Sequence, residues 1–177
     1  MAENWNKVLL GARGWQHAGW AGTFYPEDLP QDWQLNYYTN EFSVLVIPEQ
    51  EWVSREDVSS LTEECGVDFR FVPELPQCEN EAEWEAQMAR LQQLGEYAGG
   101  VIIHHGQDQY IGSVGTIPIF SEVDGTLIKI PAACSLKVLR SLMETAMQSP
   151  TAMLLQVEGE PPDTELLHNA QILLELL

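Results

Sequence analysis

The chain has 177 residues and carries 27 acidic against 8 basic side chains, a formal net charge of −19 at pH 7. No nucleic-acid binding and no attachment to an anionic membrane are expected, because both need clustered Lys and Arg. The length and the 45% share of hydrophobic residues predict one globular domain over residues 1–177.

Predicted strands and helices alternate in the first part of the chain. Short apolar runs predict buried strands over residues 8–10, 43–47, 67–72 and 101–103. Helices are predicted over residues 31–39, from Ser54 to Cys65, and from Asn80 to the Gly99-Gly100 pair. This alternation is typical of parallel strands joined by helical crossovers, so an α/β fold is expected.

The rest of the chain departs from this alternation. Residues 117–122 and 126–130 flank a Val-Asp-Gly turn signal, which predicts a β-hairpin. A helix over residues 135–147 and a strand over residues 152–157 follow. The last helix begins at Asp163 or Thr164, and its apolar face is too wide for a lone surface helix. We therefore expect this helix to seal the core or to form a homodimer interface.

Cysteine usage and the absence of targeting patterns indicate a cytoplasmic location. Cys65, Cys78 and Cys134 are an odd number without paired spacing, so neither a disulfide framework nor a structural zinc site is expected. The first residues show no signal-peptide pattern, and no apolar run reaches membrane-spanning length.

An aromatic loop follows the first predicted strand. The segment GARGWQHAGWAGTFYPEDLPQDWQLNYYTNEF contains a Gly-Trp pair, a W-x-G-x-F-Y-P motif, a Tyr-Tyr pair and a final Phe. In these motifs and their spacing it resembles the opening of the YecE-like family, the domain of unknown function 72. Residues 69–76 and 91–103 and the C-terminal helix are similar to later family segments, and the clear similarity ends near residue 105.

The resemblance implies a TIM-like (β/α) barrel, whose functional residues lie at the C-terminal ends of the strands. An eight-stranded barrel usually needs more than about 200 residues. We therefore expect a reduced or incomplete TIM-barrel-like domain with a β-hairpin insertion. The family's polar strand-end residues are replaced here by Val46, Pro48, Glu74 and the pair His104-His105. These departures predict that a catalytic role is not inherited.

Five ligand-pocket candidates lie in or next to the aromatic loop. Arg13 and His17 flank the Gly-Trp pair and could bind an anion or a carboxylate, although in so acidic a chain Arg13 is expected to pair with an internal Asp or Glu. Trp15, Trp20 and Tyr25 could line a pocket for a ring-shaped ligand, or they could plug one end of the barrel.

Four further candidates follow other predicted strands: Glu49, Glu74, His104 and His105. Imidazole and carboxylate side chains are suitable ligands for zinc or another divalent metal. Adjacent strand residues point to opposite faces, so one histidine of the pair at most faces a barrel interior. The alternative is one packed and one exposed histidine, and no HxH or HExxH spacing supports a metal site, so no metal and no cofactor is assigned.

These observations favour a bacterial-type protein that binds a small ligand or another protein without catalysis. The first alternative is a metal-dependent hydrolase or lyase that uses the strand-end His and Glu residues. The second is an acidic protein that docks on a basic partner, although its acids are spread along the chain, as on an ordinary solvated surface.

Overall fold

Parallel strands form the centre of the molecule. The computed structural model describes residues 8–104 and 117–177. Five strands pair in one sheet in the order β3-β2-β1-β7-β6, and every neighbouring pair is parallel. Their bounds are β1 Val8–Arg13, β2 Val44–Ile47, β3 Arg70–Pro73, β6 Leu127–Ile130 and β7 Met153–Val157. The α/β class that the alternation predicts is confirmed.

Two further strands form a small parallel sheet beside β3. Strand β4 (Val101–Ile102) pairs with β5 (Ile119–Phe120), and isolated bridges join Phe71 to Ala98 and Glu74 to Ile102. All seven of these strands contribute to one apolar cluster: Leu9, Val44, Val46, Val72, Ile102, Phe120, Leu127 and Leu154. Within the described residues the strands do not form a closed barrel, so the TIM-like arrangement is not confirmed.

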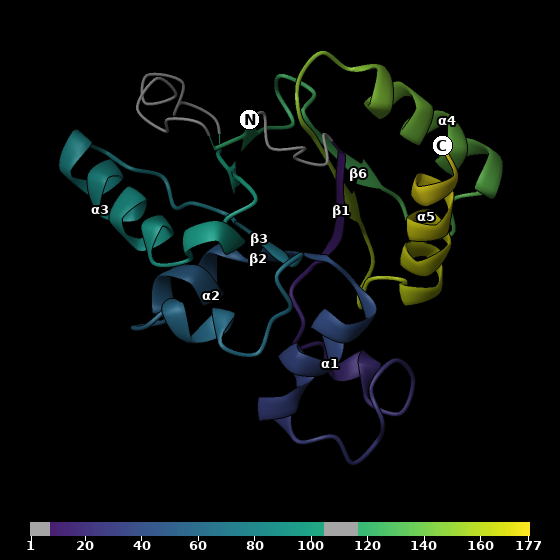
Figure 1. Ribbon diagram of the computed structural model, residues 1–177, viewed down its shortest axis with the longest axis horizontal. Coiled ribbons are helices and arrows are strands. Elements are labelled where there is room, and N and C mark those ends of the chain that lie inside the picture. The colour runs from purple at the N-terminus through teal and green to yellow at the C-terminus, as the bar shows by residue number, and fades with distance from the viewer. Residues whose placement is uncertain (1–7, 105–116) are drawn as a thin grey trace.

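Helices surround these strands (Figure 1). Helices α2 and α3 lie on one side of the central strands, α4 and α5 lie together on the opposite side, and α1 lies at one end. Their bounds are α1 Gln34–Glu41, α2 Glu49–Ser54, α3 Glu81–Gln92, α4 Leu136–Gln148 and α5 Thr164–Leu176. The predicted caps Asn80 and Asp163 are confirmed, because each side chain accepts a backbone N–H hydrogen bond at the start of its helix.

The predicted β-hairpin over residues 117–130 is wrong. Strand β5 pairs with β4 and strand β6 pairs with β7, in both cases in parallel, so the two segments do not pair with each other. The turn signal itself is real, since Gly125 has a φ of +74° and the amides of Thr126 and Leu127 donate to the Ser121 carbonyl. The pairing follows instead from the burial of Phe120 and Leu127 in the apolar cluster to which all seven strands contribute, here called the seven-strand cluster.

The predicted helix from Ser54 to Cys65 is also wrong in its extent. Ser54 is the last residue of α2, and only a short 3₁₀ helix forms over Ser59–Thr62. The Asp57 carboxylate accepts hydrogen bonds from the amide (2.9 Å) and hydroxyl (2.5 Å) of Ser59. Such local side-chain bonds compete with a continuous helix, so the residues form a turn.

The continuous apolar run of β2 is covered on both faces, as its pattern predicts. Val44 and Val46 belong to the seven-strand cluster, and Leu45 and Ile47 belong to the larger core beneath the helices. Alternate residues of a strand point to opposite faces, so both faces must be apolar here.

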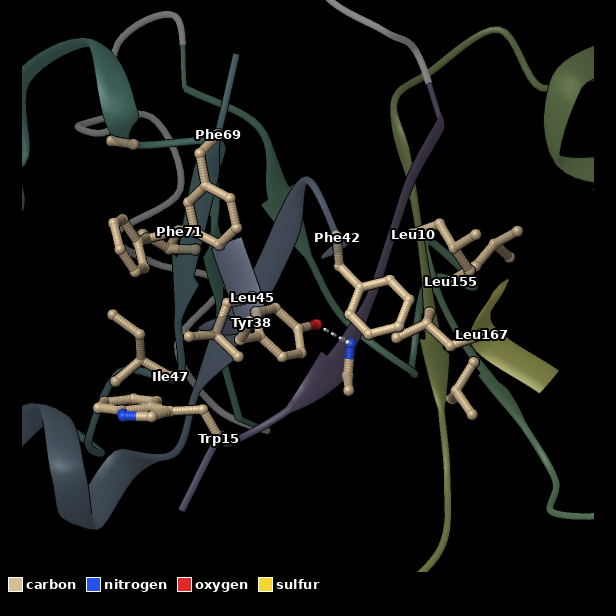
Figure 2. Close-up of a cluster of buried hydrophobic side chains, with 14 of the residues drawn as sticks. Leu10, Trp15, Tyr38, Phe42, Leu45, Ile47, Phe69, Phe71, Leu155 and Leu167 are labelled. Carbon is tan, nitrogen blue, oxygen red and sulfur yellow. Dashed lines mark hydrogen bonds between the residues drawn. The ribbon is translucent and has the colours of Figure 1, made fainter. Parts of the chain in front are cut away.

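Tyr38 lies on helix α1, and its side chain is part of the larger core (Figure 2). Its fully buried hydroxyl donates to the Val44 carbonyl (2.8 Å) and accepts from the Ala12 amide (3.1 Å). Burial raises the pKa of the Tyr38 phenol, because the low-dielectric surroundings disfavour its charged form.

Helix α5 seals one side of the core with Leu166, Leu167 and Ala170, which are buried. Ile172 and Leu176 remain exposed toward the end of the same helix. The wide apolar face is thus used partly within the chain, and a homodimer through α5 stays a prediction. In the described ranges no helix has the length and apolar character that crossing a membrane would need.

Candidate functional site

Polar side chains gather where the parallel strands end. Arg13 is the last residue of β1, and Glu74 and His104 follow β3 and β4. Glu49 begins the helix that follows β2. The carboxyl ends of parallel strands meet at one edge of a sheet, which is where ligands bind in open and closed α/β folds.

A cavity of about 380 Å³ opens at this edge, here called the strand-end pocket. Strands β1, β3, β4, β5, β6 and β7, or the residues directly after them, contribute to its walls. Its polar lining residues are Arg13, His17, Glu74, His104, Ser121, Glu122, Lys129, Gln156, Glu158 and Glu160. Four of the nine candidates from the sequence therefore lie in this one pocket.

Arg13 and Glu74 form an ion pair inside the pocket. The Arg13 Nε atom lies 2.5 Å from Glu74 Oε1. Only 9% of Glu74 is exposed, whereas Arg13 is an exposed residue. The prediction that Arg13 pairs with an internal acid is confirmed, and the guanidinium places an opposite charge beside the buried Glu74 side chain.

The two described histidines of the candidate set have different partners. His104 Nε2 lies 3.1 Å from Glu49 Oε2, and both side chains are partly exposed. His17 Nε2 lies 2.8 Å from the Arg13 carbonyl oxygen. Since a carbonyl only accepts, His17 carries its proton on Nε2 and helps to hold the chain at the end of β1.

A metal centre is not assembled by the side chains that the structure describes. Residues 8–104 and 117–177 contain no group of three or more His, Cys, Asp and Glu side chains that could hold a metal ion. Glu49 and His104 provide two potential ligands. The candidate His105 lies outside the described residues.

Three polar residues of the pocket were not predicted from the sequence. Ser121 and Gln156 are buried polar residues in the pocket wall, and Lys129 Nζ lies 3.0 Å from Glu122 Oε1 at its rim. A signal was present in the sequence, since Lys129 and Gln156 each follow an inward-facing Leu by two positions. Strand alternation then places them on the same face, one layer closer to the strand ends.

The aromatic loop candidates lie beside the pocket rather than in it. Trp20 is buried, and its Nε1 atom donates to the Pro162 carbonyl at 2.9 Å. The Tyr25 hydroxyl donates to the Trp15 carbonyl at 2.6 Å, and burial raises the pKa of this phenol. Trp15 is buried beneath the Arg55 guanidinium, which lies 5.7 Å from its ring centroid. In these contacts the aromatic side chains hold the loop against the strand ends.

Comparison with known proteins identifies the lineage but no activity. No curated protein and no solved structure matches the chain. The family model described as protein of unknown function DUF72 matches residues 9–104, a span that begins within β1 and contains the aromatic loop and strands β2, β3 and β4. This match covers just over half of the 177 residues. The chain therefore belongs to the DUF72 family.

Proposed function

We propose that this protein is a non-catalytic module that binds a small polar molecule in the strand-end pocket. The observation that carries the proposal is a cavity of about 380 Å³ at the strand ends whose lining includes buried polar residues. Small-molecule sites typically measure about 300–1,000 Å³ and place a few polar groups among apolar walls. Ile102, Leu127 and Val157 supply apolar lining here.

The architecture that supports this pocket is, in our proposal, a reduced barrel of the TIM type. All seven described strands contribute residues to one apolar cluster, as is expected for the interior of such a barrel. The isolated bridges between β3 and the β4 region place β4 next to β3, which extends the order of the five-stranded sheet. A packed apolar interior closes the pocket from below, as in barrels whose ligands bind above the strand ends.

Ion pairing of the charged groups favours binding over catalysis. Arg13 contacts Glu74, and Lys129 contacts Glu122. A general acid or base acts through a group free to exchange a proton with the substrate. Mutual pairing instead fixes these side chains as hydrogen-bonding walls. An acidic face that docks on a basic protein stays a prediction.

Removing a pocket cation tests the binding proposal. We expect ligand-observed NMR with a mixture of polar metabolites to give at least one binder, whose affinity Lys129→Ala lowers at least fivefold. Lys137→Ala removes the same charge from the exposed face of α4 and is expected to leave the affinity unchanged. Absence of any binder, or equal affinity in wild type and Lys129→Ala, would contradict the proposal.

The His104–Glu49 pair favours a second candidate, a metal-dependent hydrolase or lyase. A carboxylate at 3.1 Å orients an imidazole for metal binding or proton transfer. The two residues also lie at the strand ends, where barrel enzymes carry their chemistry.

Zinc separates the two candidates. The metal-dependent enzyme requires that Zn²⁺ raise the melting temperature of the metal-stripped protein by several degrees, and that His104→Ala remove this rise. His168→Ala, on helix α5, is the matched histidine control. The non-catalytic proposal instead expects the same melting temperature with and without Zn²⁺ in all three proteins, measured by differential scanning fluorimetry.

A further inference from the structure

Two buried side chains in the pocket wall have hydrogen-bonding capacity that the described protein does not use. Gln156 is 3% exposed, and its Nε2 atom donates to Glu158 Oε1 at 3.1 Å. Its Oε1 atom accepts no hydrogen bond from residues 8–104 or 117–177. Because Gln156 lines the pocket, this oxygen can accept a hydrogen bond from a donor on a bound ligand.

Ser121 has an unused hydrogen-bond donor rather than an unused acceptor. It is 7% exposed, and its Oγ atom accepts from the Val123 amide at 3.1 Å. Its own hydroxyl proton has no acceptor among the described side chains and carbonyls. The pocket therefore offers one acceptor and one donor that the described residues leave unused. A hydroxyl group, which both donates and accepts, can satisfy either of them.

The charges on the pocket walls disfavour an anionic ligand. Four carboxylates and two permanent cations line the cavity: Glu74, Glu122, Glu158, Glu160, Arg13 and Lys129. The two cations already face carboxylates, Arg13 at Glu74 and Lys129 at Glu122. A phosphate or carboxylate bound to either cation would lie beside the carboxylate already paired with that cation and would be repelled by it.

We propose that the ligand class is a neutral polyhydroxylated molecule, such as a sugar or a polyol. This inference rests on the proposed small-molecule function and names the chemistry that the same pocket recognises. Carboxylate and amide oxygens accept from ligand hydroxyls, and the Ser121, Arg13 and Lys129 donors bind the hydroxyl oxygens. Ile102, Leu127 and Val157 contact the carbon skeleton.

A panel of sugar-like ligands that differ in charge tests whether the pocket prefers a neutral ligand. Isothermal titration calorimetry is carried out with a panel of neutral hexoses, pentoses and polyols, together with glucosamine and glucose 6-phosphate. We expect at least one neutral member to bind, and glucose 6-phosphate to bind at least tenfold more weakly than that member. Gln156→Met keeps the size of the side chain but removes both its acceptor oxygen and the amide that donates to Glu158, and it is expected to weaken binding of the neutral ligand at least tenfold.

Two further variants make this result specific. Ser121→Ala removes the second unused group and is expected to weaken the same ligand at least threefold. Gln148→Met makes the same exchange at the exposed end of α4 and is expected to leave the affinity unchanged. Melting temperatures of all variants show whether a loss of binding reflects a loss of fold. Unchanged affinity in both folded pocket variants would overturn the inference.

The outcomes separate the inference from the proposed function. If only glucosamine or only glucose 6-phosphate binds, and Lys129→Ala weakens that binding, the ligand class is wrong while the small-molecule function stands. The same holds if no panel member binds but another metabolite binds in the NMR screen with the Lys129 dependence. If neither experiment gives a binder, both proposals fail.

Discussion

Trp20→Ala is expected to lower the free energy of unfolding by about 3–5 kcal/mol, as for other buried Trp side chains cut back to Ala. Trp20 is 2% exposed and packs edge-on against Phe24 and Tyr25, with ring centroids 5.1 and 5.5 Å away. Its indole N–H also holds the Pro162 carbonyl, 142 residues away in the sequence. The substitution therefore leaves a cavity and an unsatisfied carbonyl together.

Urea denaturation followed by circular dichroism measures this effect without depending on tryptophan fluorescence. Trp33→Ala is the matched control, because Trp33 is 64% exposed and belongs to the same N-terminal aromatic segment. We expect the control to change stability by at most about 0.5 kcal/mol. Equal losses in the two variants would show that Trp20 does not connect the aromatic loop to the residues after β7.

Tyr38→Phe is expected to lower the free energy of unfolding by about 2–4 kcal/mol, since each buried polar group left unsatisfied costs about 1–3 kcal/mol. The substitution removes one oxygen and leaves the ring in place. The Ala12 amide then loses its acceptor and the Val44 carbonyl loses its donor. Tyr37→Phe is the control on the same helix, because the Tyr37 hydroxyl has no hydrogen bond to any described residue.

Alkaline pH gives a second readout of the same residue. Burial raises the pKa of Tyr38 above its ordinary value near 10, so the unfolded chain releases this proton at lower pH than the folded chain. The stability of the wild type should therefore be unaffected by this group below pH 10 and fall as the pH rises above it. Tyr38→Phe should show a smaller fall, and Tyr25, whose pKa burial also raises, accounts for part of what remains. An equal fall in both proteins would contradict the assignment.

Where local signals and burial agreed, the sequence predicted the structure well. The β2 run, the Asn80 cap and the apolar face of α4 each satisfy local preference and core packing at once. The prediction failed for residues 117–130, where each strand pairs with a segment elsewhere in the chain instead of with its neighbour. Nothing in residues 117–130 specifies that β5 pairs with β4 and β6 with β7, because pairing depends on segments distant in the chain.

The candidate site shows the same division. Sequence reasoning placed Arg13, Glu74 and His104 at strand ends, and the structure brings all three to one pocket. It did not find Ser121 or Gln156, because the two-residue alternation that places Gln156 on the pocket face identifies a pocket only when the strand pairing is known. Their importance comes from burial, which only the packed structure reveals.

By itself, the sequence determined the lineage, the α/β class and the acidic character of this protein. Apolar periodicity, caps and the aromatic motif are local properties, and they can be read without knowing which segments meet. Only the tertiary structure decided which strands pair, that Trp20 and Tyr25 support the loop, and which polar groups line the strand-end pocket. The physical reason is that burial of a polar or aromatic side chain depends on neighbours that the chain brings together only when it folds.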